Sequence, residues 1–293
     1  MIESDLGGVF APITTPFDAA SGDVSPQHLK DNVARLLGDG LDGIVVAGST
    51  GEAPLLDVEE QRRAVAWTRE VTPEGKWLVV GTGAESTRQA IALTRAAAAE
   101  GADAVLVRPP SYFPAVAARA LANYYRAIAD ASPVPVLLYN IPKYTHVTLP
   151  AELLQELSTH TRVVGVKDSS GDLKNLAAYR EAAPQWAVFV GGASLLLSAI
   201  ELECDGGIVG VACFAPRLCA DLVAAFRAGD RARATALQDR ITPLDKEIVA
   251  KLGPAGVKAA MDAVGLYGGP PRPPLAPLGP AERERVALLV RGD

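Results

Sequence analysis

A lysine and a tyrosine stand at the ends of two successive apolar segments of the chain. Lys167 ends the run Arg162–Lys167 and is followed by a polar turn, Asp168–Asp172. One strand–helix step earlier, Tyr139 ends the run Val134–Tyr139. Because functional side chains of a parallel barrel project from the carboxyl ends of its strands, we expect these two to converge on one small molecule.

An amine and a phenol so arranged suit covalent catalysis on a carbonyl. Lysine is the residue that forms Schiff bases, and only its neutral form attacks. Burial in a barrel mouth disfavours the charged form of an amine. The Tyr139 phenol could then move protons on and off oxygen, with hydroxyl partners as a relay. The alternative interpretation is a solvated lysine beside an aromatic core residue.

Hydroxyls and glycines follow the other apolar runs. Ser49 and Thr50 lie in Gly48–Glu52, where glycines expose N–H groups that can hold a carboxylate; the alternative is a turn that caps a helix. Tyr112 either serves the same site or merely packs. Gly192 follows another run, where we expect close backbone approach to a carboxylate.

The elements that must position these residues recur with a regular spacing. Short runs rich in Val, Ile and Leu predict parallel strands buried on both faces. Helices with start signals lie between them, such as Asp57 with Glu60, Ser86 with Gln89, and Ser25 before a proline. The predicted strands are 8–13, 43–47, 77–81, 103–107, 134–139, 162–167, 187–191 and 207–211. Eight such units predict a closed (β/α)8 TIM barrel over residues 1–221, with an open doubly wound sheet as the competing fold.

The tail, residues 222–293, has a different pattern and predicts a C-terminal helical extension. Its expected helices are 222–229, 231–241, 243–251 and 255–264, followed by a Pro-rich stretch and a last helix from Pro280. We expect this extension to pack on the barrel rather than to form a second catalytic domain.

Composition excludes several classes of function. The 293-residue chain has a formal net charge of −6 and no basic block, which argues against nucleic-acid binding. No apolar stretch approaches the roughly 18 residues of a membrane span, and Met1–Asp5 shows no signal peptide. Three cysteines without a CxxC pair indicate buried thiols in a reducing cytoplasm.

Neither a metal nor a nicotinamide cofactor is expected. The three histidines are far apart in sequence and form no HxH or HExxH motif. Gly81–Ser86 nearly matches a dinucleotide fingerprint, but serine replaces the third glycine and no acidic residue ends the following strand.

Three motifs together make the chain resemble the pyruvate-dependent class I aldolase/lyase family. They are Gly-Ser-Thr-Gly-Glu at 48–52, Tyr-Asn-Ile-Pro at 139–142 and Gly-Val-Lys-Asp-Ser-Ser-Gly-Asp at 165–172. The family includes dihydrodipicolinate synthase, N-acetylneuraminate lyase, 4-hydroxy-2-oxoglutarate aldolase and the 2-keto-3-deoxy-sugar-acid aldolases. The resemblance spans nearly the whole chain.

The resemblance implies a role for several residues. Lys167 forms a Schiff base with pyruvate, and Tyr139 is the proton donor and acceptor. Ser49 and Thr50 bind the pyruvate carboxylate and join the relay, and Tyr112 completes that relay across a subunit interface. The further substrate-binding positions are Val209, through its backbone, and Ser169, Gly192 and Tyr144. The resemblance also implies a cofactor-free homotetramer, a dimer of dimers, acting on pyruvate and an aldehyde.

The member of the family is harder to choose. Tyr144 stands where dihydrodipicolinate synthase has an arginine that holds the carboxylate of aspartate semialdehyde, and a phenol cannot make that bidentate contact. Lys143 is an alternative point charge. Segments 81–104 and 253–280 look most similar to 4-hydroxy-2-oxoglutarate aldolase, as does the tripeptide Asp168–Ser170. We expect that aldolase; the alternatives are the synthase, a sugar-acid aldolase or N-acetylneuraminate lyase, and an inactive pyruvate-binding relative.

Overall fold

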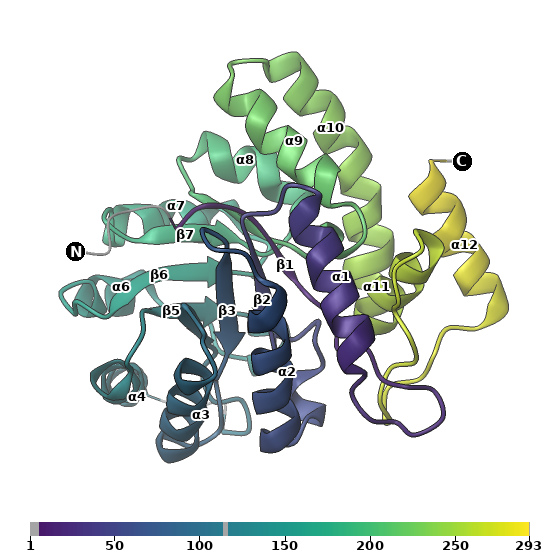
Figure 1. Cartoon of the computed structure of the whole chain (residues 1–293). Helices are drawn as coiled ribbons and strands as arrows, with labels where there is room; N and C mark the ends of the chain where they lie inside the picture. The colour runs from purple at the N-terminus through teal and green to yellow at the C-terminus, as the bar shows by residue number, and fades with distance from the viewer. Residues whose placement is uncertain (1–5, 114–116, 293) are drawn as a thin grey trace.

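A closed barrel of eight parallel strands forms the centre of the molecule (Figure 1). The computed structural model describes residues 6–113 and 117–292. Each strand pairs with its sequence neighbours, and the first pairs with the last. The strands are β1 (Gly8–Pro12), β2 (Gly43–Val46), β3 (Trp77–Gly81), β4 (Ala104–Val107), β5 (Val136–Asn140), β6 (Val163–Asp168), β7 (Ala187–Val190) and β8 (Gly206–Ile208). The predicted TIM barrel is confirmed.

The strands are apolar on both faces because each face meets a different part of the core. Inward side chains such as Phe10, Leu106, Leu137 and Phe189 fill the barrel. Their outward neighbours pack against the surrounding helices in a second, larger cluster. This two-sided burial explains why the strand sequences show continuous apolar runs instead of alternation.

Helices surround the barrel and connect its strands. They are α1 (Pro26–Gly38), α2 (Val58–Val71), α3 (Thr87–Ala99), α4 (Ala118–Ala131), α5 (Pro142–Thr145), α6 (Ala151–Leu157), α7 (Leu173–Ala182), α8 (Leu196–Glu201) and α9 (Pro216–Arg227). Asp57 and Glu60 form the expected capping box, and Ser86 accepts a hydrogen bond from the Gln89 N–H. Ser25 precedes α1 but makes no side-chain cap bond.

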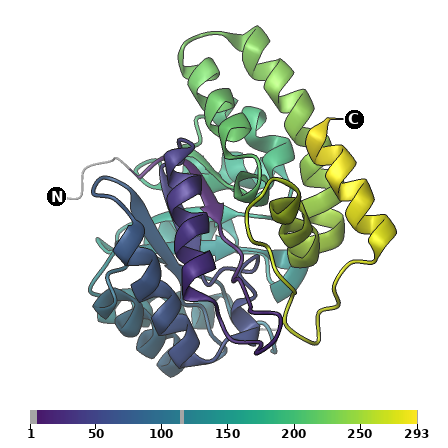
Figure 2. The same ribbon diagram turned by 45° about the vertical axis from the view of Figure 1, so that its right-hand side comes forward.

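The C-terminal part is helical, as expected, but several of its predicted bounds are wrong. Helix α9 begins at Pro216 rather than at 222. Helix α10 (Arg231–Leu244) runs through Pro243 into a π-helical turn, and α11 (Lys251–Ala263) continues past a kink at Gly253. Helix α12 (Pro280–Arg291) packs beside α11, and Figure 2 shows both helices on one flank of the barrel. The division of the chain at 221 stays a prediction.

Strand 8 also differs from its predicted range of 207–211. It ends at Ile208, and Gly210–Cys213 form a 3-10 turn. The three cysteines are buried and free, as expected. Among the described residues, no helix has the length and hydropathy needed to span a bilayer. Residues 1–5, on which the absence of a signal peptide was judged, lie outside the described part, and a cytoplasmic location stays a prediction.

Candidate active site

Lys167 and Tyr139 lie on neighbouring strands at the same level of the barrel. They are register partners in the β5–β6 pair, and both are only 5% exposed. Lys167 Nζ lies 3.3 Å from the Tyr139 hydroxyl and 4.3 Å from the centre of its ring. This geometry places a buried amine beside a phenol, the two kinds of group that Schiff-base chemistry on a carbonyl uses.

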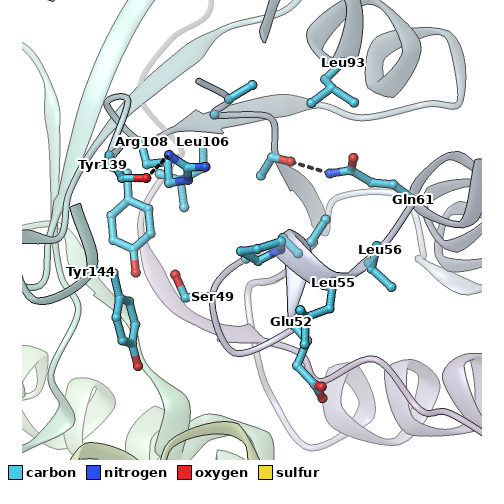
Figure 3. A pocket seen from close by; sticks show the side chains of 18 of the residues that line it. Ser49, Glu52, Leu55, Leu56, Gln61, Leu93, Leu106, Arg108, Tyr139 and Tyr144 are labelled. Atoms are coloured by element: carbon cyan, nitrogen blue, oxygen red, sulfur yellow. Dashed lines mark hydrogen bonds between the residues drawn. The ribbon is translucent and has the colours of Figure 1, made fainter. Parts of the chain in front are cut away.

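A cavity of about 630 Å³ opens beside this pair. Ser49, Tyr139 and Tyr144 lie on its wall, and Figure 3 shows the hydroxyls of Ser49 and Tyr139 directed into the same space. Lys167 is not among the residues that line the cavity, but it contacts Tyr139, which does line it. The structure therefore brings together the predicted amine, phenol and serine.

Contacts to its backbone hold the loop that carries Ser49 and Thr50 in place. The Thr15 hydroxyl donates a 2.6 Å hydrogen bond to the Gly51 carbonyl oxygen. Glu52 has a left-handed backbone, φ 57°, which a non-glycine residue adopts only when its surroundings impose it. Thr50 is half-buried and does not line the cavity.

Those surroundings are a buried ion pair between the barrel and the C-terminal helices. Lys258 Nζ lies 2.6 Å from Glu52 Oε1, with side-chain exposures of 1% and 0%. Glu52 Oε1 accepts no hydrogen bond of good geometry among the described residues, so the contact is an ion pair without a well-formed hydrogen bond. Glu52 Oε2 accepts from the Arg272 N–H, and Lys258 also donates to the Pro270 carbonyl oxygen. The Pro-rich stretch is thus bound to the Ser49 loop.

A second buried carboxyl follows Lys167. Asp168 accepts hydrogen bonds from Asn140 Nδ2 at 2.6 Å and from the Ser170 hydroxyl at 2.7 Å. Burial raises the pKa of Asp168, and these hydrogen bonds oppose the rise. The contacts join the ends of β5 and β6, so they hold Tyr139 and Lys167 in register.

Tyr144 follows β5 on the short helix α5. Its side chain is half-exposed and lines the cavity, while burial and then the nearby Tyr139 raise its pKa. Lys143, the alternative cation at this place, is turned away: its Nζ donates to the Ala250 carbonyl oxygen and lies 5.6 Å from the Tyr144 ring centre.

Three other predicted substrate-binding residues are outside the cavity wall. The Val209 N–H bonds the Phe10 carbonyl oxygen, and the Val209 carbonyl oxygen accepts from Ala212. The Ser169 hydroxyl fills the space that a Cβ on Gly191 would take. Gly192 lies beside the carboxylate of Asp245. Their assigned roles stay predictions.

Tyr112 is 78% exposed and does not line the cavity of its own chain. Its ring packs edge-on against exposed Phe113. The Glu85 carboxylate positions this segment by accepting hydrogen bonds from the Ser111 and Tyr112 N–H groups and from the Ser111 hydroxyl. Burial opposes ionisation of Glu85, but these bonds and Arg108 outweigh it and lower its pKa to about 2.

Sequence reasoning passed over Arg108, Glu85 and Lys258. Arg108 directly follows β4 and lines the cavity, but the sequence prediction took only Tyr112 from the segment after this strand. Its position immediately after an apolar run was a usable signal, the same one that identified Lys167. Glu85 and Lys258 act through partners remote in sequence, and no local pattern marks such pairs.

Comparison with known proteins gives a consistent result. Residues 5–292 match the model of the dihydrodipicolinate synthetase family. The chain is 36% identical over 273 residues to 4-hydroxy-tetrahydrodipicolinate synthase of Methanothrix thermoacetophila, covering 92% of this chain and 91% of the relative. It is 36% identical over 288 residues to a probable mitochondrial 4-hydroxy-2-oxoglutarate aldolase of Emericella nidulans, covering 96% and 92%.

A solved structure extends the likeness to three dimensions. The fold matches a prophage protein of Escherichia coli K12, determined in complex with pyruvate, with a TM-score of 0.93, 25% identity and 99% coverage of both chains. That protein belongs to the dihydrodipicolinic acid synthase family. From this match and the two relatives, the present chain is a lyase of the aldolase type and belongs to the dihydrodipicolinate synthetase family.

Proposed function

We propose that the chain is a class I aldolase that reversibly cleaves a 4-hydroxy-2-oxo acid into pyruvate and an aldehyde, with 4-hydroxy-2-oxoglutarate and glyoxylate as the leading pair. The observation that carries the proposal is the 3.3 Å contact between the buried Lys167 amine and the Tyr139 phenol beside a substrate-sized cavity. The relatives named above support both pyruvate chemistry and this cleavage.

In the proposed mechanism Lys167 supplies the electron sink. Its neutral amine attacks C2 of the substrate, and loss of water gives a protonated imine. Tyr139 takes the proton of the C4 hydroxyl, the C3–C4 bond breaks, and its electron pair moves into the imine to form an enamine. The aldehyde leaves, a proton returns to C3, and water then hydrolyses the imine to release pyruvate.

In this proposal the other site residues bind the substrates or transfer protons. Ser49 and Thr50 hold the C1 carboxylate, Ser49 passes protons to Tyr139, and the Val209 backbone and Gly192 border pyruvate. Ser169 and Tyr144 flank the acceptor. Tyr112 acts from a neighbouring subunit of a homotetramer, and its exposed position beside Phe113 supports such a contact. No cofactor takes part.

Borohydride reduction in the presence of pyruvate tests this mechanism. It should fix a pyruvate adduct on Lys167 that mass spectrometry of peptides locates, and chelators should leave activity unchanged. An adduct that persists in Lys167→Ala, or no adduct in the wild-type enzyme, contradicts the proposal.

The second candidate is 4-hydroxy-tetrahydrodipicolinate synthase, favoured by the identity to the Methanothrix enzyme. Tyr144, in place of a carboxylate-binding arginine, argues for the aldolase instead. Rates of pyruvate condensation with glyoxylate, aspartate semialdehyde and N-acetylmannosamine separate the two and also test the sugar-acid alternatives.

A further inference from the structure

The proposed acceptor, glyoxylate, carries a carboxylate that needs a binding partner. The cations near the barrel mouth are mostly engaged elsewhere. Lys143 donates to a backbone carbonyl oxygen, Lys258 pairs with Glu52, and Arg272 pairs with Glu60. Arg108 is the only lysine or arginine among the described residues that line the cavity.

Arg108 stands at the level of the reacting pair. Leu106 and Leu137 are register partners that both face the barrel interior. Side chains alternate between the two faces of a strand, so the residues two positions further along, Arg108 and Tyr139, lie level with each other on the same face. Lys167 is the register partner of Tyr139. Figure 3 shows Arg108 and Tyr139 on the same part of the cavity wall.

The guanidinium group is held in place by one of its nitrogens. Arg108 Nη1 lies 3.0 Å from Glu85 Oε1, 2.9 Å from the Pro109 carbonyl oxygen and 3.5 Å from the Ser111 hydroxyl. A Cβ on Gly83 would lie 2.5 Å from both Arg108 Cγ and the Arg108 backbone nitrogen, so glycine at this position allows the two segments to pack closely. The arginine is therefore pre-positioned, which reduces the entropy lost on binding.

The other edge of the Arg108 guanidinium makes no hydrogen bond within the described part of the chain. Nε and Nη2 have no hydrogen-bond partner within residues 6–113 and 117–292. Two parallel N–H groups on one edge of a guanidinium match the two oxygens of a carboxylate. Glu85 does not compete for this edge, because its oxygens already accept from Ser111, Tyr112 and Nη1.

We propose that Arg108 binds the carboxylate of the acceptor aldehyde, so that the enzyme selects aldehydes bearing a carboxylate over neutral ones. This specificity rests on the aldolase function proposed above. The residue that binds the acceptor carboxylate then lies immediately after β4, whereas the sequence pointed to the position of Tyr144 after β5. Glyoxylate and aspartate semialdehyde both satisfy it, and uncharged sugar-derived aldehydes do not.

Glyoxylate and glycolaldehyde are matched probes, because they differ only in a carboxylate against a hydroxymethyl group. With pyruvate as donor, Arg108→Met should lower kcat/KM for glyoxylate by about 10- to 100-fold, the usual effect of losing a charged hydrogen-bonding pair. The value for glycolaldehyde should change less than about threefold. Arg108→Lys should give an intermediate preference, because it keeps the charge and loses the paired N–H groups.

Two controls separate this role from a structural one. Glu85→Gln removes the ion pair that positions Arg108 but keeps the arginine and its contact with the Pro109 carbonyl oxygen, so the preference for glyoxylate should fall much less than in Arg108→Met. Equal losses for both acceptors in Arg108→Met, or the same change of ratio in Glu85→Gln, would overturn the inference. Borohydride trapping of pyruvate is measured first. If the wild-type enzyme is trapped but Arg108→Met leaves the ratio of the two acceptors unchanged, only the role of Arg108 is refuted. If the wild-type enzyme is not trapped, the proposed function is refuted and this inference with it.

Discussion

Two lysines are buried in the described part of this protein, and they differ in their side-chain partners. Lys167 and Lys258 are 5% and 1% exposed, and each lies over an aromatic ring, Tyr139 at 4.3 Å and Phe17 at 4.4 Å. Lys258 also has a carboxylate, Glu52, at 2.6 Å. For Lys167 the side-chain partner is a neutral phenol.

This difference in partners suits a structural role for Lys258 and the proposed chemical role for Lys167. Burial lowers the pKa of Lys258, and Glu52 opposes that change, so the amine is retained as one half of an ion pair. Such an amine is held by its partner and has no freedom to attack a carbonyl. Lys167 makes no salt bridge among the described residues, and its neighbour is a phenol, a group that can accept or donate a proton. Burial alone therefore does not distinguish the proposed nucleophile, Lys167, from a structural lysine, whereas the side-chain partner does.

Exchanging each lysine for methionine should give opposite results. Lys167→Met should reduce kcat by roughly 10⁴-fold or more, because the nucleophile is lost. Its free energy of unfolding should change by less than about 1 kcal/mol, since no buried charge loses its partner. Steady-state kinetics and urea denaturation measure the two quantities. The comparison breaks if Lys167→Met is as unstable as Lys258→Met.

Tyr139→Phe removes the proton carrier but keeps the ring under Lys167. We expect kcat to fall by roughly 10²- to 10⁴-fold, the range for a lost general acid–base group. Tyr179→Phe is the matched control, because that buried phenol donates to the Leu149 carbonyl oxygen at 2.6 Å instead of contacting the lysine. Full activity in Tyr139→Phe would assign the proton transfer to another group.

Lys258→Met should chiefly affect stability. Removing one partner leaves Glu52 buried and unpaired, which costs about 3–5 kcal/mol of unfolding free energy. The double variant Glu52→Gln with Lys258→Met should regain most of that loss, because no charge remains buried. Chemical denaturation at pH 7 measures both. A single-variant loss below about 1 kcal/mol would show that the pair contributes little.

The smallest expected effect concerns the segment that covers Lys258. Hydrogen bonds from Arg272 are the main cause of a lowered pKa at Glu60, whose ordinary value is 4.5. A carboxyl with a lowered folded-state pKa stabilises above its unfolded pKa, and this stabilisation is lost as the pH falls through the folded value. Glu60→Gln should thus be about 1 kcal/mol less stable at pH 7.

That difference should shrink in acid. The urea midpoints of the wild-type protein and Glu60→Gln should approach each other as the pH is lowered from 7 to 3, because protonation of Glu60 removes the charge that Arg272 stabilises. Glu59→Gln is the control, since Glu59 is exposed and makes only surface pairs with Arg62 and Arg63. A difference that is constant with pH would show that Glu60 acts by packing and not by charge.

The barrel and the Lys167–Tyr139 pair were predictable from the sequence because both depend on local patterns. Apolar runs mark the strands, and the residue after each run marks the catalytic edge. The C-terminal bounds were less predictable. Pro243 and Gly253 look like helix ends, yet a π-helical turn between them keeps the helix nearly continuous.

Contacts between distant segments could not be predicted. The Lys258–Glu52 pair joins a helix near the end of the chain to a loop near its beginning, and neither residue lies in a pattern that names the other. Arg108 directly follows the apolar run of β4, but its contact with Glu85 links two segments that no local pattern connects. The division of roles between the two lysines therefore required the structure.

The hydrogen bond from the Arg272 N–H to Glu52 joins residues 220 positions apart, and it has a consequence for biosynthesis. The ribosome delivers the strands in order, at roughly 5–20 residues per second. Glu52 emerges early, but the backbone group and the Lys258 amine that complete its surroundings emerge last. A nascent chain can therefore contain all eight strands and both Lys167 and Tyr139 while the Ser49 loop still lacks its support. The Ser49 loop therefore gains this support only after residues 258–272 have been synthesised.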